Sequence, residues 1–135
     1  SYDRHHKHTY YLIRHADIAG LTDTERELVA RVARYHRRSG PHAGHKAMEG
    51  LSHDEVRMVR KLATLLRVAD SLDLSHHQPV RAVKAVTRED RVDLELRARG
   101  AVDLELWDLE HERPLFRQVF GKRLEISVKG VRGGR

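Results

Sequence analysis

The sequence predicts an α+β protein that is mainly helical, in which a helical part is followed by a small ββαβ unit. Two Ser/Thr-x-x-Glu capping boxes each precede a run of apolar residues at helical spacing. After Pro79 the apolar residues recur at every second position, as they do in strands. With 135 residues, 39% of them hydrophobic, the chain can bury a core of its own.

We expect three segments along the chain. Residues 1–78 would form the helical domain, and residues 79–130 the ββαβ subdomain. Residues 131–135 contain two further glycines and would form a flexible tail.

The helical domain begins with a short predicted helix over residues 5–15. The first capping box, Thr22 and Glu25, opens a second helix that runs to about Arg38. A loop rich in Gly and His follows over residues 39–50.

The second capping box, Ser52 and Glu55, opens the most strongly amphipathic helix, predicted over residues 53–74. At 100° per residue, one face is expected to be buried: Val59, Leu62, Leu65, Leu66, Ala69 and Leu72. The opposite face is expected to be exposed: Arg57, Arg60, Thr64, Arg67 and Ser71.

Beyond Pro79 we expect a hairpin whose strands cover residues 80–86 and 92–96, joined by a turn at residues 88–90. A helix over residues 101–111 follows, and Pro114 either kinks it or separates it from a second short helix that ends near Phe120. A third strand is predicted at residues 124–128.

Composition excludes several kinds of site. The chain contains no Cys, so it cannot form a disulfide, a thiolate zinc site or an iron–sulfur cluster. No stretch approaches the roughly 18 apolar residues of a membrane span, and no signal peptide opens the chain. We therefore expect a cytoplasmic location and no membrane partner.

The net charge of +6 is unevenly distributed. Residues 1–46 carry +4 and residues 114–135 carry +5, whereas residues 88–113 carry −4. The basic segments allow a polyanionic partner but do not require one. Only 5% of the residues are aromatic, which together with the acidic middle ranks a nucleic-acid-binding module last.

Three residues in the helical part could carry chemistry. Asp73 falls on the expected apolar face of the 53–74 helix and Asp70 on its flank, so both carboxylates need partners. His36 lies on the apolar face of the preceding helix and could meet Asp70. This pair could be structural, or it could belong to a metal or phosphate site.

A second candidate is the N-terminal histidine cluster, which with Arg4 and Lys7 nearby could receive phosphate or a metal: His5, His6 and His8. The segment Gly40–Lys46 is not a phosphate-binding loop, because three residues instead of four separate its glycines and Ala47 follows the lysine.

Three blocks resemble the exopolyphosphatase / guanosine pentaphosphate phosphatase family. They are residues 5–14 (HHKHTYYLIR), residues 32–38 (VARYHRR) and residues 65–73 (LLRVADSLD), the last followed by Ser75 and His76. The hairpin and the helix containing Trp107 look like the C-terminal extension of that family.

This resemblance implies an HD-like helical domain in this chain. The family's catalytic, actin-like domains, and the His-Asp block of the HD-like domain, would lie upstream of Ser1. Within it, Asp70 matches the final Asp of the HD metal site, and His8 and His36 match accessory histidines. The residual metal site would thus be His36 and Asp70, with Asp73 as a buried structural polar residue. Any cofactor would be a divalent cation, Mg²⁺ or Mn²⁺, in the full-length enzyme.

The resulting hypothesis is an accessory region of a phosphatase that acts on polyphosphate or guanosine pentaphosphate. The region would support a homodimer and would bind the polyanion through six side chains: His5, Lys7, His8, Arg34, Arg37 and Arg38. A stand-alone HD-type metal phosphohydrolase acting on nucleotides, and a structural dimerisation domain without ligand, are the alternatives.

Overall fold

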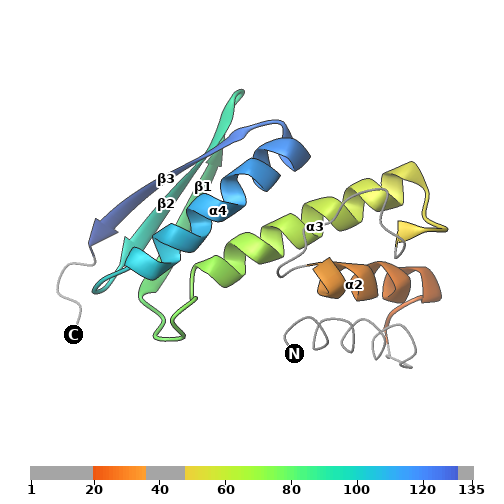
Figure 1. Ribbon diagram of the computed structural model, residues 1–135, viewed down its shortest axis with the longest axis horizontal. Helices are drawn as coiled ribbons and strands as arrows, with labels where there is room; N and C mark the ends of the chain where they lie inside the picture. Colours follow the sequence, from red (N-terminus) through yellow and green to blue (C-terminus); the bar gives the residue numbers. More distant parts are fainter. Residues whose placement is uncertain (1–19, 36–47, 131–135) are drawn as a thin grey trace. The chain divides into compact units, whose positions relative to one another are not determined.

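The chain is described by a computed structural model that covers residues 20–35 and 48–130 (Figure 1). The elements in order are α2 (Asp23–Tyr35), α3 (His53–Ser71), β1 (Val80–Thr87), β2 (Arg91–Ala98), α4 (Asp103–Phe120) and β3 (Arg123–Gly130). The mainly helical α+β class and the ββαβ order of the C-terminal part are confirmed.

Two compact units make up the chain, Ser1–Leu66 and Arg67–Arg135, and the division falls within α3. The segments expected from the sequence, 1–78, 79–130 and 131–135, follow changes in sequence pattern and stay a prediction. In the described ranges no helix has both the length and the apolar character needed to cross a membrane.

Both capping boxes form as predicted. The N–H of Thr22 donates to Glu25 Oε1 at 2.9 Å, and the N–H of Glu25 donates to Thr22 Oγ1 at 3.1 Å. Ser52 and Glu55 make the same reciprocal pair at 3.0 and 3.1 Å. The bonds with Thr22 hold the pKa of the Glu25 carboxyl below its usual range. These caps satisfy donors that a helix start leaves without partners, which is why α2 and α3 begin where they do.

The first unit packs around a small apolar cluster. Its buried members come from α2, α3 and the turn before α3: Tyr35, Met48, Val59 and Ala63. Leu28 and Val32 of α2 pack against it at the helical spacing expected from the sequence. The described part of this unit is therefore a pair of helices that pack together through a small hydrophobic core.

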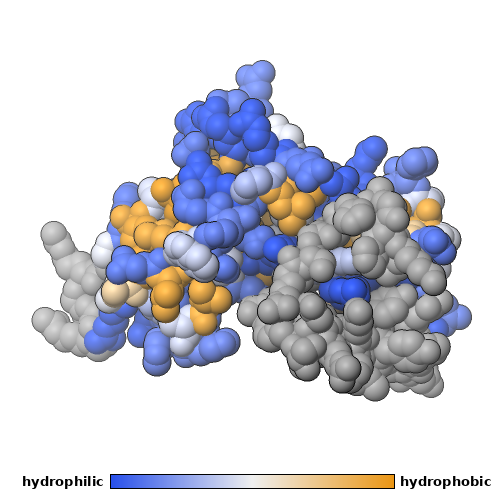
Figure 2. All heavy atoms as spheres, viewed as in Figure 1, coloured by the Kyte–Doolittle hydropathy of each residue, from blue (hydrophilic) through white to orange (hydrophobic). Residues whose placement is uncertain are grey.

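The predicted orientation of α3 is wrong in part, although Val59 is fully buried as expected. Thr64 and Ser71, expected in solvent, are fully buried, whereas Leu62, Leu65 and Leu66, expected in the core, are 39–49% exposed. With Met58, these three leucines form an exposed apolar stripe along one side of α3. Figure 2 shows apolar side chains reaching the surface in patches between hydrophilic ones.

Hydrogen bonds explain how hydroxyl groups can occupy the buried side of α3. The Thr64 hydroxyl donates to the Arg60 carbonyl oxygen at 2.7 Å, and the Ser71 hydroxyl lies 3.1 Å from the Arg67 carbonyl oxygen. A hydroxyl satisfied by its own helix loses most of the cost of leaving water. Hydropathy therefore placed these two hydroxyl-bearing residues on the wrong side of the helix.

The second unit is built on a three-stranded sheet in the order β1-β2-β3. The hairpin is antiparallel, as predicted, and pairs Lys84 with Glu95. β2 and β3 are parallel, and α4 provides the crossover between them. Leu109 and Phe116 of α4 pack on one face of the sheet, against an apolar set from the strands that includes Leu94, Leu96 and Leu124.

α4 is one uninterrupted helix of 18 residues, and Pro114 lies within it. Proline removes the N–H that would bond the Glu110 carbonyl oxygen, which is tolerable here because Pro114 is exposed and water can reach the backbone. The helix ends at Gly121, whose φ of 69° favours glycine and whose N–H donates to the Arg117 carbonyl oxygen at 2.8 Å.

The difference in burial between Val59 and Leu62, both expected in the core, gives a paired stability prediction. Val59→Ala should lower the free energy of unfolding by about 2 kcal/mol, because it removes buried methyl groups and leaves a void. Leu62→Ala should lower it by less than about 1 kcal/mol, because that side chain is 43% exposed. Urea denaturation of the two variants measures both values, and equal losses would contradict the observed orientation.

Candidate functional site

Of the six side chains expected to bind a polyanion, Arg34 is the one that the structure describes. His5, Lys7 and His8 lie outside the described residues, as do Arg37 and Arg38. Their proposed role in binding therefore stays a prediction.

Arg34 lies in the last turn of α2 and is half-buried. Its guanidinium carbon is 5.3 Å from the centre of the Tyr35 ring, a cation–π distance. Nearby arginines are engaged by carboxylates: Arg26 lies 3.2 Å from Asp23, and Arg31 bonds Glu27. Within the described ranges no such ion pair of Arg34 is present.

The expected metal pair cannot be assembled from the described residues. Asp70 is half-buried in the last turn of α3, and His36 lies outside the described ranges. Among the residues that are described, no three His, Asp or Glu side chains lie together as metal ligands would. The described residues thus do not provide a site for the divalent cation that the resemblance implies, and no reaction step is drawn through one.

Asp73 was expected on the apolar face of a helix over residues 53–74. It lies outside that helix, because α3 ends at Ser71. It is half-buried in the turn that follows, where its Oδ1 accepts a hydrogen bond of 2.7 Å from the N–H of Gln78. Gln78 and His76 both have positive φ, of 52° and 61°. The carboxylate thus helps to hold a backbone conformation that side chains disfavour.

A line of polar contacts joins the end of α3 and the turn after it to α4, all within the second unit. Arg67 Nε donates to Glu112 Oε1 at 2.7 Å, and the Ser71 hydroxyl donates to Asp108 Oδ2 at 2.6 Å. The third contact runs from the Ser75 N–H to Glu105 Oε2, at 2.9 Å. We call these six residues the polar seam: Arg67, Ser71, Ser75, Glu105, Asp108 and Glu112.

The seam explains why two glutamates of α4 are tolerated in the interior. Glu105 is 2% exposed and Glu112 is 7% exposed. Burial acts to raise the pKa of Glu105, but hydrogen bonds from Ser75 outweigh it, so this pKa lies below its usual range. Glu105 is therefore ionised at neutral pH, held by donors from the turn after α3.

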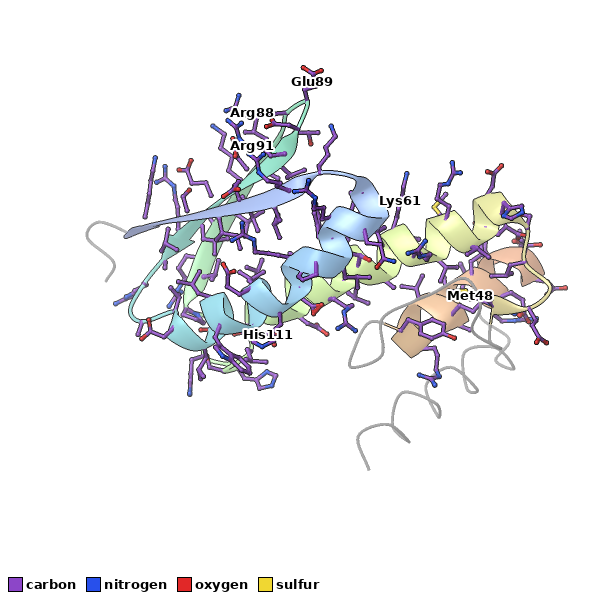
Figure 3. The ribbon with its side chains drawn as sticks, turned by 45° about the horizontal axis from the view of Figure 1, so that its top comes forward. Met48, Lys61, Arg88, Glu89, Arg91 and His111 are labelled. Atoms are coloured by element: carbon purple, nitrogen blue, oxygen red, sulfur yellow. The ribbon has the colours of Figure 1, made fainter. Side chains whose placement is uncertain are left out.

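Ion pairs also cover the hairpin end of the sheet. Asp93 accepts hydrogen bonds from Arg88 and Arg91, which lower the pKa of its carboxyl. Figure 3 shows Arg88 and Arg91 on the hairpin, with Glu89 at its tip. The hollow beside this network, about 300 Å³, is lined by three carboxylates and two basic side chains, so it does not favour an anion.

The polar seam was missed by sequence reasoning although its spacing is visible in the sequence. Glu105, Asp108 and Glu112 recur at i, i+3 and i+7, which places them on one side of a helix. Arg67, Ser71 and Ser75 recur every four residues and face them. Two polar stripes with matching spacing can therefore belong to a contact between two elements and not only to an exposed surface.

The described elements define an α+β protein with a helical part and a ββαβ part. The family model for Ppx/GppA phosphatase, domain III, matches residues 1–113. The chain therefore belongs to the Ppx/GppA phosphatase family, which confirms the resemblance drawn from its three blocks. None of the curated proteins compared matches it.

The pKa of Glu105 gives a prediction with a defined pH dependence. Because the folded pKa lies below the ordinary value of 4.5, the stabilisation is present above about pH 4.5 and is lost as the pH falls through the folded pKa. Glu105→Gln should therefore lower the free energy of unfolding by about 1–2 kcal/mol at pH 7.

Chemical denaturation at pH 7 and at pH 3 measures this effect, which should shrink at the lower pH. Glu89→Gln is the control, because Glu89 is exposed at the tip of the hairpin. A loss for Glu105→Gln that is equal at both pH values would show that Glu105 is not held as an ion.

Proposed function

We propose that this chain is an accessory, non-catalytic region of an exopolyphosphatase-type phosphatase and that it binds the polyanionic substrate. The observation that carries the proposal is the match of residues 1–113 to domain III of the family. The complete enzyme would release the terminal phosphate of polyphosphate or of guanosine pentaphosphate. In this proposal the domain guides the chain of phosphates and leaves bond cleavage to other domains.

Charge supports this role for the helical part. Residues 1–46 carry a net charge of +4, and Arg34 presents a guanidinium without a carboxylate partner among the described residues. His5, Lys7, His8, Arg37 and Arg38 would extend the same binding surface. Many weak contacts suit a uniform polyanion, since each phosphate can be held equally by any cation along the path.

The polyanion proposal predicts that Arg37→Ala combined with Arg38→Ala weakens the binding of long-chain polyphosphate by about tenfold at low salt. Arg57→Ala with Lys61→Ala is the matched control, because it removes two exposed cations from α3. Titration calorimetry on the full chain measures both. Equal weakening by the two variants would show that only net charge matters, and unchanged affinity would remove the proposal.

We also propose that the protein forms a homodimer through the exposed apolar stripe of α3. Met58 and Leu65 are 51% and 49% exposed, and Leu62 and Leu66 lie on the same side of the helix. A second copy is the fitting occupant, because a two-fold axis would set this stripe against itself and match apolar surface with apolar surface. This observation also favours the alternative of a dimerisation domain that binds no anion.

Dimerisation predicts a change in mass when the stripe is made charged. Leu65→Glu should convert a dimer to a monomer in analytical ultracentrifugation, because two like charges would face each other across the axis. Leu104→Glu is the control, since Leu104 is 57% exposed on α4, an element of the second unit. A wild-type chain that sediments as a monomer at high concentration would contradict this proposal and leave polyanion binding unaffected.

A further inference from the structure

A hollow of about 310 Å³ opens between α4 and β3, within the second unit. Six residues line it: Glu110, Arg113, Pro114, Arg117, Arg123 and Leu124. Three of the six are arginines and one is a glutamate, so the lining carries a net charge of +2. This charge distinguishes it from the hollow on the hairpin side of the sheet, where carboxylates outnumber cations.

Local structure brings the three arginines to the lining of one hollow. Arg113 and Arg117 are four residues apart on α4 and therefore lie on the same side of the helix. The left-handed turn at Gly121 ends α4 and returns the chain at once to β3, which begins at Arg123. The turn thus brings a third cation to two that already repel each other.

Ion pairs account for two of the three arginines. Like charges one helical turn apart cost about 0.2–0.5 kcal/mol in an isolated helix. Carboxylates relieve part of the repulsion: Arg113 lies 2.9 Å from Glu110 and 3.6 Å from Glu125, and Arg123 lies 3.2 Å from Glu125. Arg123 also lies 3.3 Å from Asp90.

Arg117 differs from its two neighbours. Across the described ranges it makes no ion pair, and it lies exposed at the edge of the hollow. A guanidinium has five N–H donors, and the carboxylates bonded to Arg113 and Arg123 use only some of theirs. Guanidinium groups suit the oxygens of a phosphate, which arginine binds in a bidentate manner.

We propose that this arginine pocket, formed by the six lining residues, is an anion site that takes a phosphate group of an oligophosphate chain. The positive lining, together with Arg117, which makes no ion pair within the described ranges, supports a phosphate at this site. The choice of an oligophosphate as the source of that phosphate rests on the proposed function. The pocket belongs to the ββαβ part and consists of other residues than the basic ones expected at the N-terminal end.

A structural role for Arg117 makes different predictions. A cation in the last turn of a helix stabilises the negative end of the helix dipole, and Arg117 occupies that position in α4. That role would affect folding but would not respond to an anion. Glu110 offers a second distinction, because its negative charge opposes an anion in the pocket and contributes little to the dipole.

The test is titration calorimetry of the full chain with tripolyphosphate in low salt. Arg117→Ala should weaken binding about tenfold, and Glu110→Gln should strengthen it about two- to threefold. Arg81→Ala, which removes an exposed arginine from β1, should change the affinity by less than about twofold. Equal weakening by Arg117→Ala and Arg81→Ala would overturn the proposal, since it would show an effect of net charge alone.

Chemical shifts of the wild-type chain give an outcome that does not depend on any variant folding. Tripolyphosphate should shift the amide of Gly121 and the Nε–H signals of Arg113, Arg117 and Arg123. Shifts confined to residues near Arg34 would overturn the pocket while supporting the proposed function. Shifts at the pocket, together with unaltered polyphosphate binding by the Arg37→Ala and Arg38→Ala double variant, would support the pocket and contradict the proposed N-terminal surface.

Discussion

The polar seam is the interaction on which the second unit depends. Its contacts fix α4 against the end of α3 and against the turn after it, and α4 in turn covers one face of the sheet. Removing one partner of a buried ion pair leaves the other charge without compensation, so Arg67 and Glu112 constrain each other. Arg67 and Ser71 also belong to a block by which the family is identified, and the seam gives those two residues a structural role.

Much of the fold follows from local rules that the sequence displays. The capping boxes, the hairpin turn and the apolar alternation of the third strand depend on neighbours within a few residues, and each was predicted correctly. The orientation of α3 could not be predicted in this way. It depends on partners such as Glu112, which lies 45 residues from Arg67, and on hydroxyl groups that bond within the helix.

The candidate site shows the same division between local and distant information. Arg34 could be selected because a run of basic residues is visible in the sequence. The arginine pocket could not, because Arg123 joins Arg113 and Arg117 only once the turn at Gly121 and the parallel pairing of β3 are known. The net charge of +5 over residues 114–135 indicated a basic segment. The fold shows that Arg117 and Arg123 of this segment line the hollow between α4 and β3.

The single tryptophan of the chain lies on the same helix as the arginine pocket. Trp107 is 61% exposed, and its ring centre is 4.3 Å from that of His111, which is labelled in Figure 3. Glu110 and Pro114, three and seven residues further along α4, share its side of the helix. The protein therefore carries an intrinsic fluorophore beside the pocket, so its emission can report on events at this surface without a chemical label.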